Sequence, residues 1–114
     1  MSADSRDLLQ GTLAILILKA LLGGTSHGYG IARWIETTTD DVLRIEEGSL
    51  YPALRRLEDR GWVTSEWGLS ENNRRARFYT ITSAGRTHVR GEAAAWMRYS
   101  AAVARVIGAE PSLI

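Results

Sequence analysis

The sequence predicts a mainly α-helical fold with one small β-hairpin and a long C-terminal helix. Apolar residues recur at helical spacing in three segments of the first half, residues 8–22, 27–37 and 49–61. Two segments with strand composition, residues 62–67 and 76–81, flank a polar loop and so form a candidate hairpin. From Val89 to Ile107, mostly apolar residues recur at alternating intervals of four and three, which is the spacing of a coiled-coil seam.

Composition sets the limits within which these elements must fold. The 114 residues suffice for one domain, and 45% hydrophobic with 24% charged residues is typical of a globular protein. The absence of cysteine excludes a disulfide framework and a thiolate metal site. The net charge is only +1, but lysine occurs only at position 19, so nearly all basic residues are arginines. Arginine gives planar, two-pronged contacts to phosphate and guanine, and so weakly favours nucleic-acid binding.

The N-terminal segment does not resemble a targeting sequence. Residues 1–7 carry acidic side chains and lack the basic region that opens a secretory signal. The apolar run Leu13–Leu22 is interrupted by Lys19 and is too short to span a bilayer. We therefore expect a cytoplasmic protein that does not enter the membrane.

The first predicted helix, Leu8–Leu22, is apolar on nearly all sides. A helix of this kind is buried on two sides. One stripe can serve the domain core, and in so small a domain we expect the other to face a second subunit. The residues of this second stripe are Leu8, Gly11, Ile15, Leu18 and Leu22.

The second predicted helix runs from about His27 to Thr37, with Ser26 as its candidate N-cap. Its expected core face consists of Ile31, Trp34 and Ile35. Val42–Ile45 is expected to form a brief extended strand that leads into the third helix.

The third predicted helix, residues 49–61, carries signals at both ends. Ser49 is a candidate N-cap, Pro52 falls in the first turn, and Gly61 can turn left-handed after the last turn. The buried face consists of Leu50, Ala53, Leu54 and Leu57. The free side, with Tyr51, Arg55 and Arg56, fits a DNA major groove; the alternative is an ordinary amphipathic helix with a solvated face. This order of elements predicts a winged helix-turn-helix domain over residues 1–82.

The hairpin that follows is the expected wing. The far side of its loop, residues 72–77, packs three guanidiniums and two amides into six positions. These groups bind phosphates and the minor groove, although a solvated hairpin tip can also be basic by chance. The expected DNA contacts of the wing are Asn73, Arg74, Arg75 and Arg77.

The last predicted helix spans residues 83–108 behind a Thr82 cap, and residues 109–114 form a tail. At about 1.5 Å per residue it is longer than the domain can cover. Its seam therefore predicts a partner helix from a second copy; the alternative is a helix that folds back on its own domain. The expected dimerisation residues are Val89, Ala93, Trp96, Val103 and Ile107.

Several short motifs together resemble the PadR family of bacterial transcriptional regulators. In chain order they are Leu9 with Gly11–Leu13, His27–Gly30, Glu47–Leu54, Leu57–Glu58 with Gly61–Trp62, and Arg74–Arg75 through Tyr79 to Thr82 with Gly85. The resemblance covers roughly residues 8 to 107. It implies a winged-helix DNA-binding domain and a dimerising C-terminal helix. PadR-like proteins are mostly repressors of their own promoter and of neighbouring transporter or detoxification genes.

Only one helix fits after Thr82, so the chain resembles the smaller branch of the family. In that branch the first and last helices of two subunits enclose a cavity where paired tryptophans can hold flat aromatic ligands. The resemblance places Trp96 in that role. The other candidate ligand-binding residues are Leu8, Gly11, Ile15, Glu92 and Ser100. Alternatively, Trp96 serves only to pack the dimer.

The resulting hypothesis is a homodimeric repressor that binds an inverted-repeat site in double-stranded DNA. The expected contacts from the third helix are Ser49, Tyr51, Pro52, Arg55 and Arg56. His27 and Tyr29, at the start of the second helix, are expected near a phosphate, although His27 can instead cap the helix and Tyr29 can belong to the core.

The sequence leaves two other classes of function to consider. One is a winged-helix protein-interaction module without specific DNA binding, in which the wing arginines meet an acidic partner. The other is an enzyme, which the sequence disfavours. His27 and His88 are not in metal-ligand spacing, and no cofactor motif is present.

Overall fold

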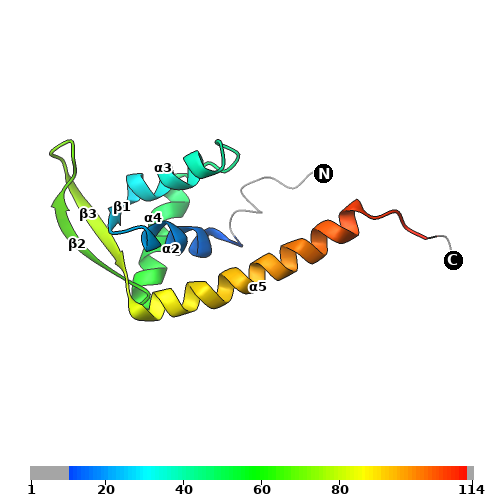
Figure 1. Cartoon of the computed structure of the whole chain (residues 1–114). Coiled ribbons are helices and arrows are strands. Elements are labelled where there is room, and N and C mark those ends of the chain that lie inside the picture. The colour runs from blue at the N-terminus through cyan, green and yellow to red at the C-terminus, as the bar shows by residue number, and fades with distance from the viewer. Residues whose placement is uncertain (1–10, 113–114) are drawn as a thin grey trace.

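The structure is a computed structural model in which residues 11–112 are described, and it has the predicted winged-helix fold with a long C-terminal helix (Figure 1). Its elements are α2 (Leu13–Leu22), β1 (Ser26–His27), α3 (Gly28–Thr38), α4 (Glu47–Asp59), β2 (Val63–Leu69), β3 (Arg75–Ile81) and α5 (Ser83–Gly108). The three strands form one antiparallel sheet in the order β1-β3-β2. The β2–β3 hairpin projects from one end of the molecule, and α5 runs away from it toward the C-terminus.

The core lies among α2, α3 and α4 and the inner ends of the strands. From α2 it takes Leu13, Ile17, Leu18 and Leu21, and from α4 it takes the four leucine and alanine positions that the sequence predicts, Leu50, Ala53, Leu54 and Leu57. The strands contribute Val63, Tyr79 and Ile81. The other apolar side chains of α2, among them Ile15, are partly buried against this core. The predicted residues Leu8 and Leu9 lie outside the described part of the chain.

The start of α3 differs from the prediction. His27, not Ser26, is the N-cap, because the His27 Nδ1 atom accepts a hydrogen bond from the Gly30 N–H at 3.0 Å. Ser26 instead pairs with Tyr79 in the sheet. The prediction that Trp34 is a core residue is also wrong, since its side chain is 47% exposed. The buried face of α3 follows the helical spacing Gly28, Ile31, Ala32 and Ile35.

The expected strand at Val42–Ile45 does not form, and the third strand is β1 instead. Backbone amides in this segment bond to side chains rather than to a neighbouring strand. The Leu43 N–H donates to Thr39 Oγ1 at 3.1 Å, and the Ile45 N–H donates to the buried Glu36 carboxylate at 2.9 Å. Asp40 and Asp41 just before it have positive φ angles of 48° and 63°, which turn the chain tightly out of α3.

The third predicted helix, α4, starts earlier than predicted. Its N-cap is Glu46, so Ser49 lies in the first turn and is not the cap. Pro52 consequently lies inside the helix, where it has no N–H for the Gly48 carbonyl one turn earlier. The predicted end is confirmed: Gly61 has a φ of 76°, and the Trp62 N–H bonds to the Leu57 carbonyl at 3.0 Å. With the Gly61 N–H on Glu58, this is a Schellman motif.

α5 begins at a closely packed joint with the end of α4. The Thr82 hydroxyl accepts from the Gly85 N–H, as predicted, and it also donates to the Gly61 carbonyl at 2.7 Å. A Cβ at Gly85 would collide with the Trp62 carbonyl. The Trp62 and His88 rings stack with centroids 3.6 Å apart. The joint therefore fixes the base of α5 to the end of α4.

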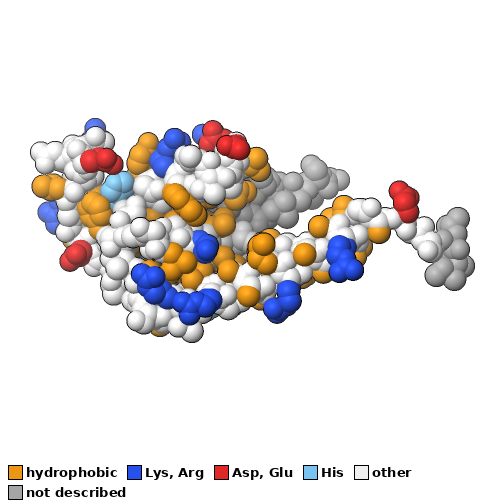
Figure 2. Space-filling model, viewed as in Figure 1, with side chains coloured by type: hydrophobic (Ala, Val, Ile, Leu, Met, Phe, Trp, Pro, Cys, Tyr) orange, Lys and Arg blue, Asp and Glu red, His pale blue; other side chains and the backbone are white. Residues whose placement is uncertain are grey.

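Beyond this joint α5 leaves the rest of the domain. Val89 is buried and Ala93 is half-buried, but Trp96, Val103 and Ile107 of the predicted seam are exposed. Figure 2 shows hydrophobic side chains continuing along this projecting part of the helix. The alternative that α5 folds back on its own domain is wrong for this part of the helix.

Candidate nucleic-acid interface

One face of the hairpin runs continuously from the core to the wing tip. Val63 pairs with Ile81 at the buried end, Ser65 with Tyr79 next, then Trp67 with Arg77, and finally Leu69 with Arg75. Because side chains alternate along a strand, all of these residues share one face of the hairpin. The apolar pairs near the core thus give way to an aromatic and basic surface toward the tip.

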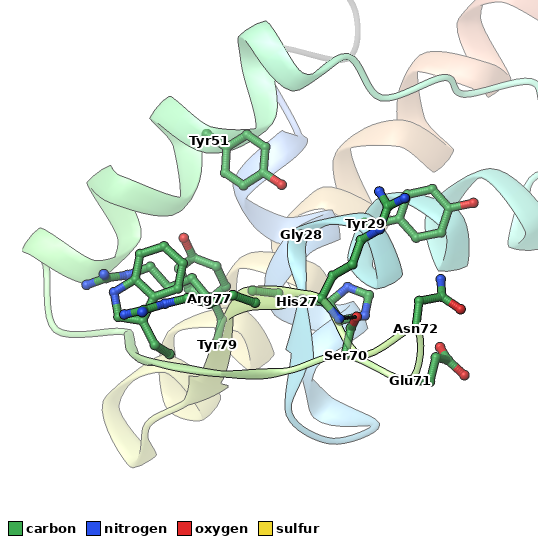
Figure 3. Close-up of a pocket in the computed structure, with 13 residues that line it drawn as sticks. His27, Gly28, Tyr29, Tyr51, Ser70, Glu71, Asn72, Arg77 and Tyr79 are labelled. Atoms are coloured by element: carbon green, nitrogen blue, oxygen red, sulfur yellow. Dashed lines mark hydrogen bonds between the residues drawn. The ribbon is translucent and has the colours of Figure 1, made fainter.

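This surface, the start of α3 and the exposed side of α4 enclose an open hollow of about 610 Å³ (Figure 3). Tyr51 reaches it from α4, Tyr29 from the start of α3, and Arg77 and Tyr79 from the hairpin. The complete lining is His27, Gly28, Tyr29, Tyr51, Trp67, Ser70, Glu71, Asn72, Arg74, Arg75, Ala76, Arg77 and Tyr79. Six of the residues predicted to contact DNA are therefore brought together here.

The other predicted DNA-contact residues lie on α4 or at the wing tip. Pro52, Arg55 and Arg56 are exposed on α4, and Ser49 is half-buried. They do not line the hollow but flank it on the same helix as Tyr51. The helix therefore presents two guanidiniums and a phenol on its free side, as the sequence indicates.

The Tyr51 ring lies against the backbone at the start of α3. A Cβ at Gly28 would be 2.7 Å from the Tyr51 hydroxyl oxygen and 2.9 Å from two ring carbons. Gly28 is therefore required at this position for the ring to keep its place. Tyr51 remains 44% exposed, so its outer edge still faces the hollow.

His27 and Tyr29 have different environments. The His27 ring meets the Phe78 ring edge to face with centroids 5.3 Å apart, in addition to capping α3. Tyr29 is 70% exposed at the rim of the hollow. Hence His27 has a local structural role, whereas Tyr29 is not a core residue.

At the wing tip, the predicted contact residue Asn73 forms the turn, and its neighbour Asn72 lines the hollow. Asn73 has a φ of 59°, and its N–H donates to the Ser70 carbonyl at 2.8 Å, which closes the turn. Asparagine tolerates this left-handed conformation better than most residues. Asn72, one residue earlier, lines the hollow.

Trp67 is the main interface residue that the sequence reasoning missed. Its ring is 55% exposed, and the guanidinium carbons of Arg75 and Arg77 lie 4.8 Å and 5.5 Å from its centre. Cation–π contacts of this kind restrain an arginine while leaving its N–H groups free at the edge. The strand register, which places Trp67 opposite Arg77, is the signal that could have identified it.

A polar network joins the wing to the last turn of α4. The Arg77 Nε atom donates to Ser65 Oγ at 2.8 Å, and the Ser65 hydroxyl donates to Glu58 Oε2 at 2.7 Å. Arg77 Nη2 also lies 3.8 Å from the same carboxylate oxygen. Beside it, burial raises the pKa of the Tyr79 hydroxyl, and the Arg77 charge partly opposes this rise.

The predicted ligand-binding residues are not gathered in this hollow. Trp96 is 42% exposed on α5, with the Tyr99 ring 6.0 Å away between centroids. Glu92 is exposed and Ser100 is half-buried on the same helix, whereas Gly11 is exposed ahead of α2. Leu8 lies outside the described residues. A ligand site at Trp96 stays a prediction.

Two kinds of feature are absent from residues 11–112. No group of three or more His, Asp or Glu side chains in this range is placed to hold a metal ion. Likewise, none of the helices described is long and apolar enough to cross a membrane.

A winged helix with a basic, aromatic face of this form is the fold of DNA-binding transcriptional regulators. The sequence model of the transcriptional regulator PadR-like family matches residues 17–91, and the chain belongs to this family. The resemblance seen in the sequence motifs is thereby confirmed.

Individual relatives agree with this assignment. A transcriptional regulator from Clostridium thermocellum is 31% identical, with a TM-score of 0.77 over 87% of this chain and 96% of that chain. A PadR family transcriptional regulator from Eggerthella lenta is 28% identical, with a TM-score of 0.74 over 93% of this chain and 90% of that one. An uncharacterized protein of Lysinibacillus sphaericus is 29% identical over 83 residues, which are 73% of this chain and 76% of that protein.

Proposed function

We propose that this protein is a homodimeric repressor that binds an inverted-repeat operator upstream of its own and neighbouring genes. The observation that carries the proposal is the face shared by α4 and the wing. It gathers Tyr51, Arg74 and Arg75 around one open hollow, and Arg55 is exposed on the same helix as Tyr51. Arginines reach phosphates and guanine edges, while the aromatic rings pack on the sugar–phosphate backbone.

In this proposal α4 enters the major groove. Tyr51, Arg55 and Arg56 face the bases, and Ser49 and Pro52 contact the backbone near the start of the helix. Arg74 and Arg75 of the wing hold the flanking phosphates, together with Asn73 at the tip. The N-terminus of α3 at Tyr29 favours a further phosphate, since a helix N-terminus attracts anions.

The exposed seam of α5 supports the homodimer. Trp96, Val103 and Ile107 are 42%, 37% and 78% exposed, and the neighbouring Met97 and Val106 are also exposed. A second copy of the helix would remove this apolar surface from water. A two-fold dimer then presents two recognition helices about one DNA turn apart, roughly 34–36 Å.

The same helix provides the proposed ligand response. Trp96 rings from two subunits would hold a flat aromatic molecule, with Ile15, Gly11, Glu92 and Ser100 nearby. A ligand that prefers a dimer with a different helix spacing lowers the affinity for the operator, and its differential affinity limits the shift. Trp96→Ala should abolish the ligand response and leave DNA binding intact.

Fluorescence anisotropy with a duplex from the region upstream of the gene tests the proposal. We expect tighter binding than to a scrambled duplex, a footprint with two half-sites, and a steep dependence on salt. Equal binding to both duplexes would place the operator elsewhere. No binding at low salt would reject DNA recognition and favour a protein-interaction module.

A further inference from the structure

The outer part of the wing receives little support from the rest of the sheet. β1 is two residues long and pairs only with Phe78 and Tyr79 of β3. Toward the tip, β2 and β3 pair with each other alone. An isolated two-stranded hairpin is only marginally stable in water. The angle of the wing to α4 therefore requires a contact outside the sheet.

The Glu58–Ser65–Arg77 network supplies this contact at the point where the hairpin leaves the core. Glu58 lies in the last turn of α4, Ser65 in β2 and Arg77 in β3, so three elements meet in two hydrogen bonds of 2.8 Å and 2.7 Å. A hydroxyl has a single proton to donate, and Ser65 gives it to the carboxylate while it accepts from the guanidinium. Both bonds involve a charged partner and are accordingly strong.

We propose that Arg77 is a positioning residue, which fixes the wing against the recognition helix and does not itself contact DNA. This inference rests on the DNA binding proposed above. The Arg77 Nε atom is engaged by Ser65, and the Nη2 atom faces Glu58. The guanidinium also packs beside Trp67, whose ring carries Arg75 at 4.8 Å. Arg77 thus orients the Trp67 ring, and Arg75, which packs on this ring, reaches a DNA phosphate from there.

A fixed wing lowers the cost of binding. Wing and helix contact different parts of the duplex, so their spacing must match the spacing of the phosphates they reach. If the wing were free, binding would have to order it, and this ordering reduces affinity. The network holds the required arrangement before DNA arrives. Loss of this network should weaken DNA binding without removing any charge from the interface.

Ser65→Ala tests the proposal, because it breaks both hydrogen bonds and changes no charge. We expect the Kd for the operator to rise about three- to tenfold, with the slope of log K against log salt unchanged. Ser65→Thr keeps the hydroxyl and should restore the affinity. Thr64→Ala, the exposed neighbour on the opposite face of β2, is the matched control. Urea unfolding of each variant shows that it remains folded under the binding conditions.

Arg77→Lys separates positioning from direct contact. It keeps the positive charge but loses the Nε donor and the planar fork. Positioning predicts a loss similar to that of Ser65→Ala, and a double variant no weaker than the weaker single one. A direct phosphate contact predicts near-normal binding for both single variants, together with a salt slope reduced by about one for Arg77→Gln. That second pattern would overturn the proposal.

Amide hydrogen exchange in the DNA-free protein keeps this test independent of operator binding. Ser65→Ala should speed exchange at residues 75–77 while leaving α2 and α4 unchanged. If the wild-type protein fails to bind DNA, the proposed function is wrong, and this measurement still decides the role of the network. Unchanged exchange at residues 75–77 would show that the network does not hold the wing.

Discussion

The molecule has two projections, the wing and the outer half of α5, and their surfaces are of opposite kinds. The wing is basic and polar at its tip, and its two strands pair with each other along their length. The outer half of α5 exposes large apolar side chains such as Tyr99, Val106 and Ile107, at 64%, 77% and 78%. A charged and polar hairpin tip can stay exposed to water, whereas a large apolar helix face is typically covered by a partner. The two projections are therefore suited to different partners, nucleic acid for the wing and protein for α5.

The largest expected effect comes from placing charge on the α5 seam. Val103→Asp with Ile107→Asp would bury unpaired carboxylates between two helices, at a cost of about 3–5 kcal/mol. We expect dimers to dissociate to monomers in sedimentation-velocity experiments at micromolar concentration.

The control for this change uses Ala94→Asp with Ala101→Asp, which add the same charge at exposed positions on the other side of the helix. This variant should remain dimeric. Dissociation of both variants, or of neither, would mean that the seam is not the dimer contact.

The second-largest effect, on DNA binding, should come from removing positive charge from the wing. Arg74→Ala with Arg75→Ala removes two charge-assisted contacts of about 1.5 kcal/mol each, and so should weaken DNA binding about 100-fold. The salt slope should fall by about two, and all sequences should be affected alike. Anisotropy titrations over a series of salt concentrations measure both.

Arg98→Ala with Arg105→Ala removes the same charge from the other projection. Both arginines are exposed on α5, away from the wing. If this control lost as much affinity as the wing variant, general electrostatic attraction would account for the effect, and the wing would not be a specific contact.

Alanine substitutions at two glycines, one near the wing and one on α5, should have smaller and opposite effects on stability. Gly28→Ala should force the Tyr51 ring away from α3, with a loss of about 1 kcal/mol in stability and weaker DNA binding. Gly91→Ala on α5 has open space around the new methyl group and should gain up to about 1 kcal/mol, because alanine favours the helix. Urea unfolding measures both. A gain in stability with unchanged DNA binding for Gly28→Ala would contradict the role given to the Tyr51 ring.

The smallest effect concerns pH. The pKa of the Tyr79 hydroxyl is raised by burial, so in the folded protein it ionises at a higher pH than in the unfolded chain. Its contribution to stability is fully present below the unfolded value of about 10 and is lost as pH rises through the folded value. The free energy of unfolding should therefore fall more steeply above pH ~10 for the wild type than for Tyr79→Phe. An equal slope for the two proteins above pH ~10 would contradict this role of Tyr79.

The elements with the strongest periodic signals could be read from the sequence. The four buried positions of α4, the Gly61 end, the Thr82 cap and the extent of α5 are local properties, and each is confirmed. Two of the errors arose where a contact outside the local segment decides. Ser26 pairs with Tyr79 across the sheet, and the amide of Ile45 bonds to Glu36 nine residues earlier, so neither the cap nor the strand was where local propensity placed it.

Only part of the candidate interface could be predicted from the sequence, because the rest depends on contacts between distant segments. A cluster of arginines and a tyrosine on a free helix side are visible in the chain. The place of Trp67 under Arg75 depends on the hairpin register, which the composition of the strands leaves open. Glu58 and Ser65 carry no motif at all, because their pairing with Arg77 exists only once α4 and the hairpin have folded together.

The joint between α4 and α5 makes the C-terminal helix a lever arm with its pivot at Trp62 and Thr82. The 26 residues of α5 span about 39 Å, so a turn of 10° at the pivot displaces the far end by about 7 Å. Because the pivot lies at one end of the 13-residue α4, the same turn displaces the other end of α4 by about 3 Å. The displacement is thus reduced roughly twofold between α5 and α4. The surface of α4, where hydrogen-bond distances matter, therefore moves less than the far end of α5.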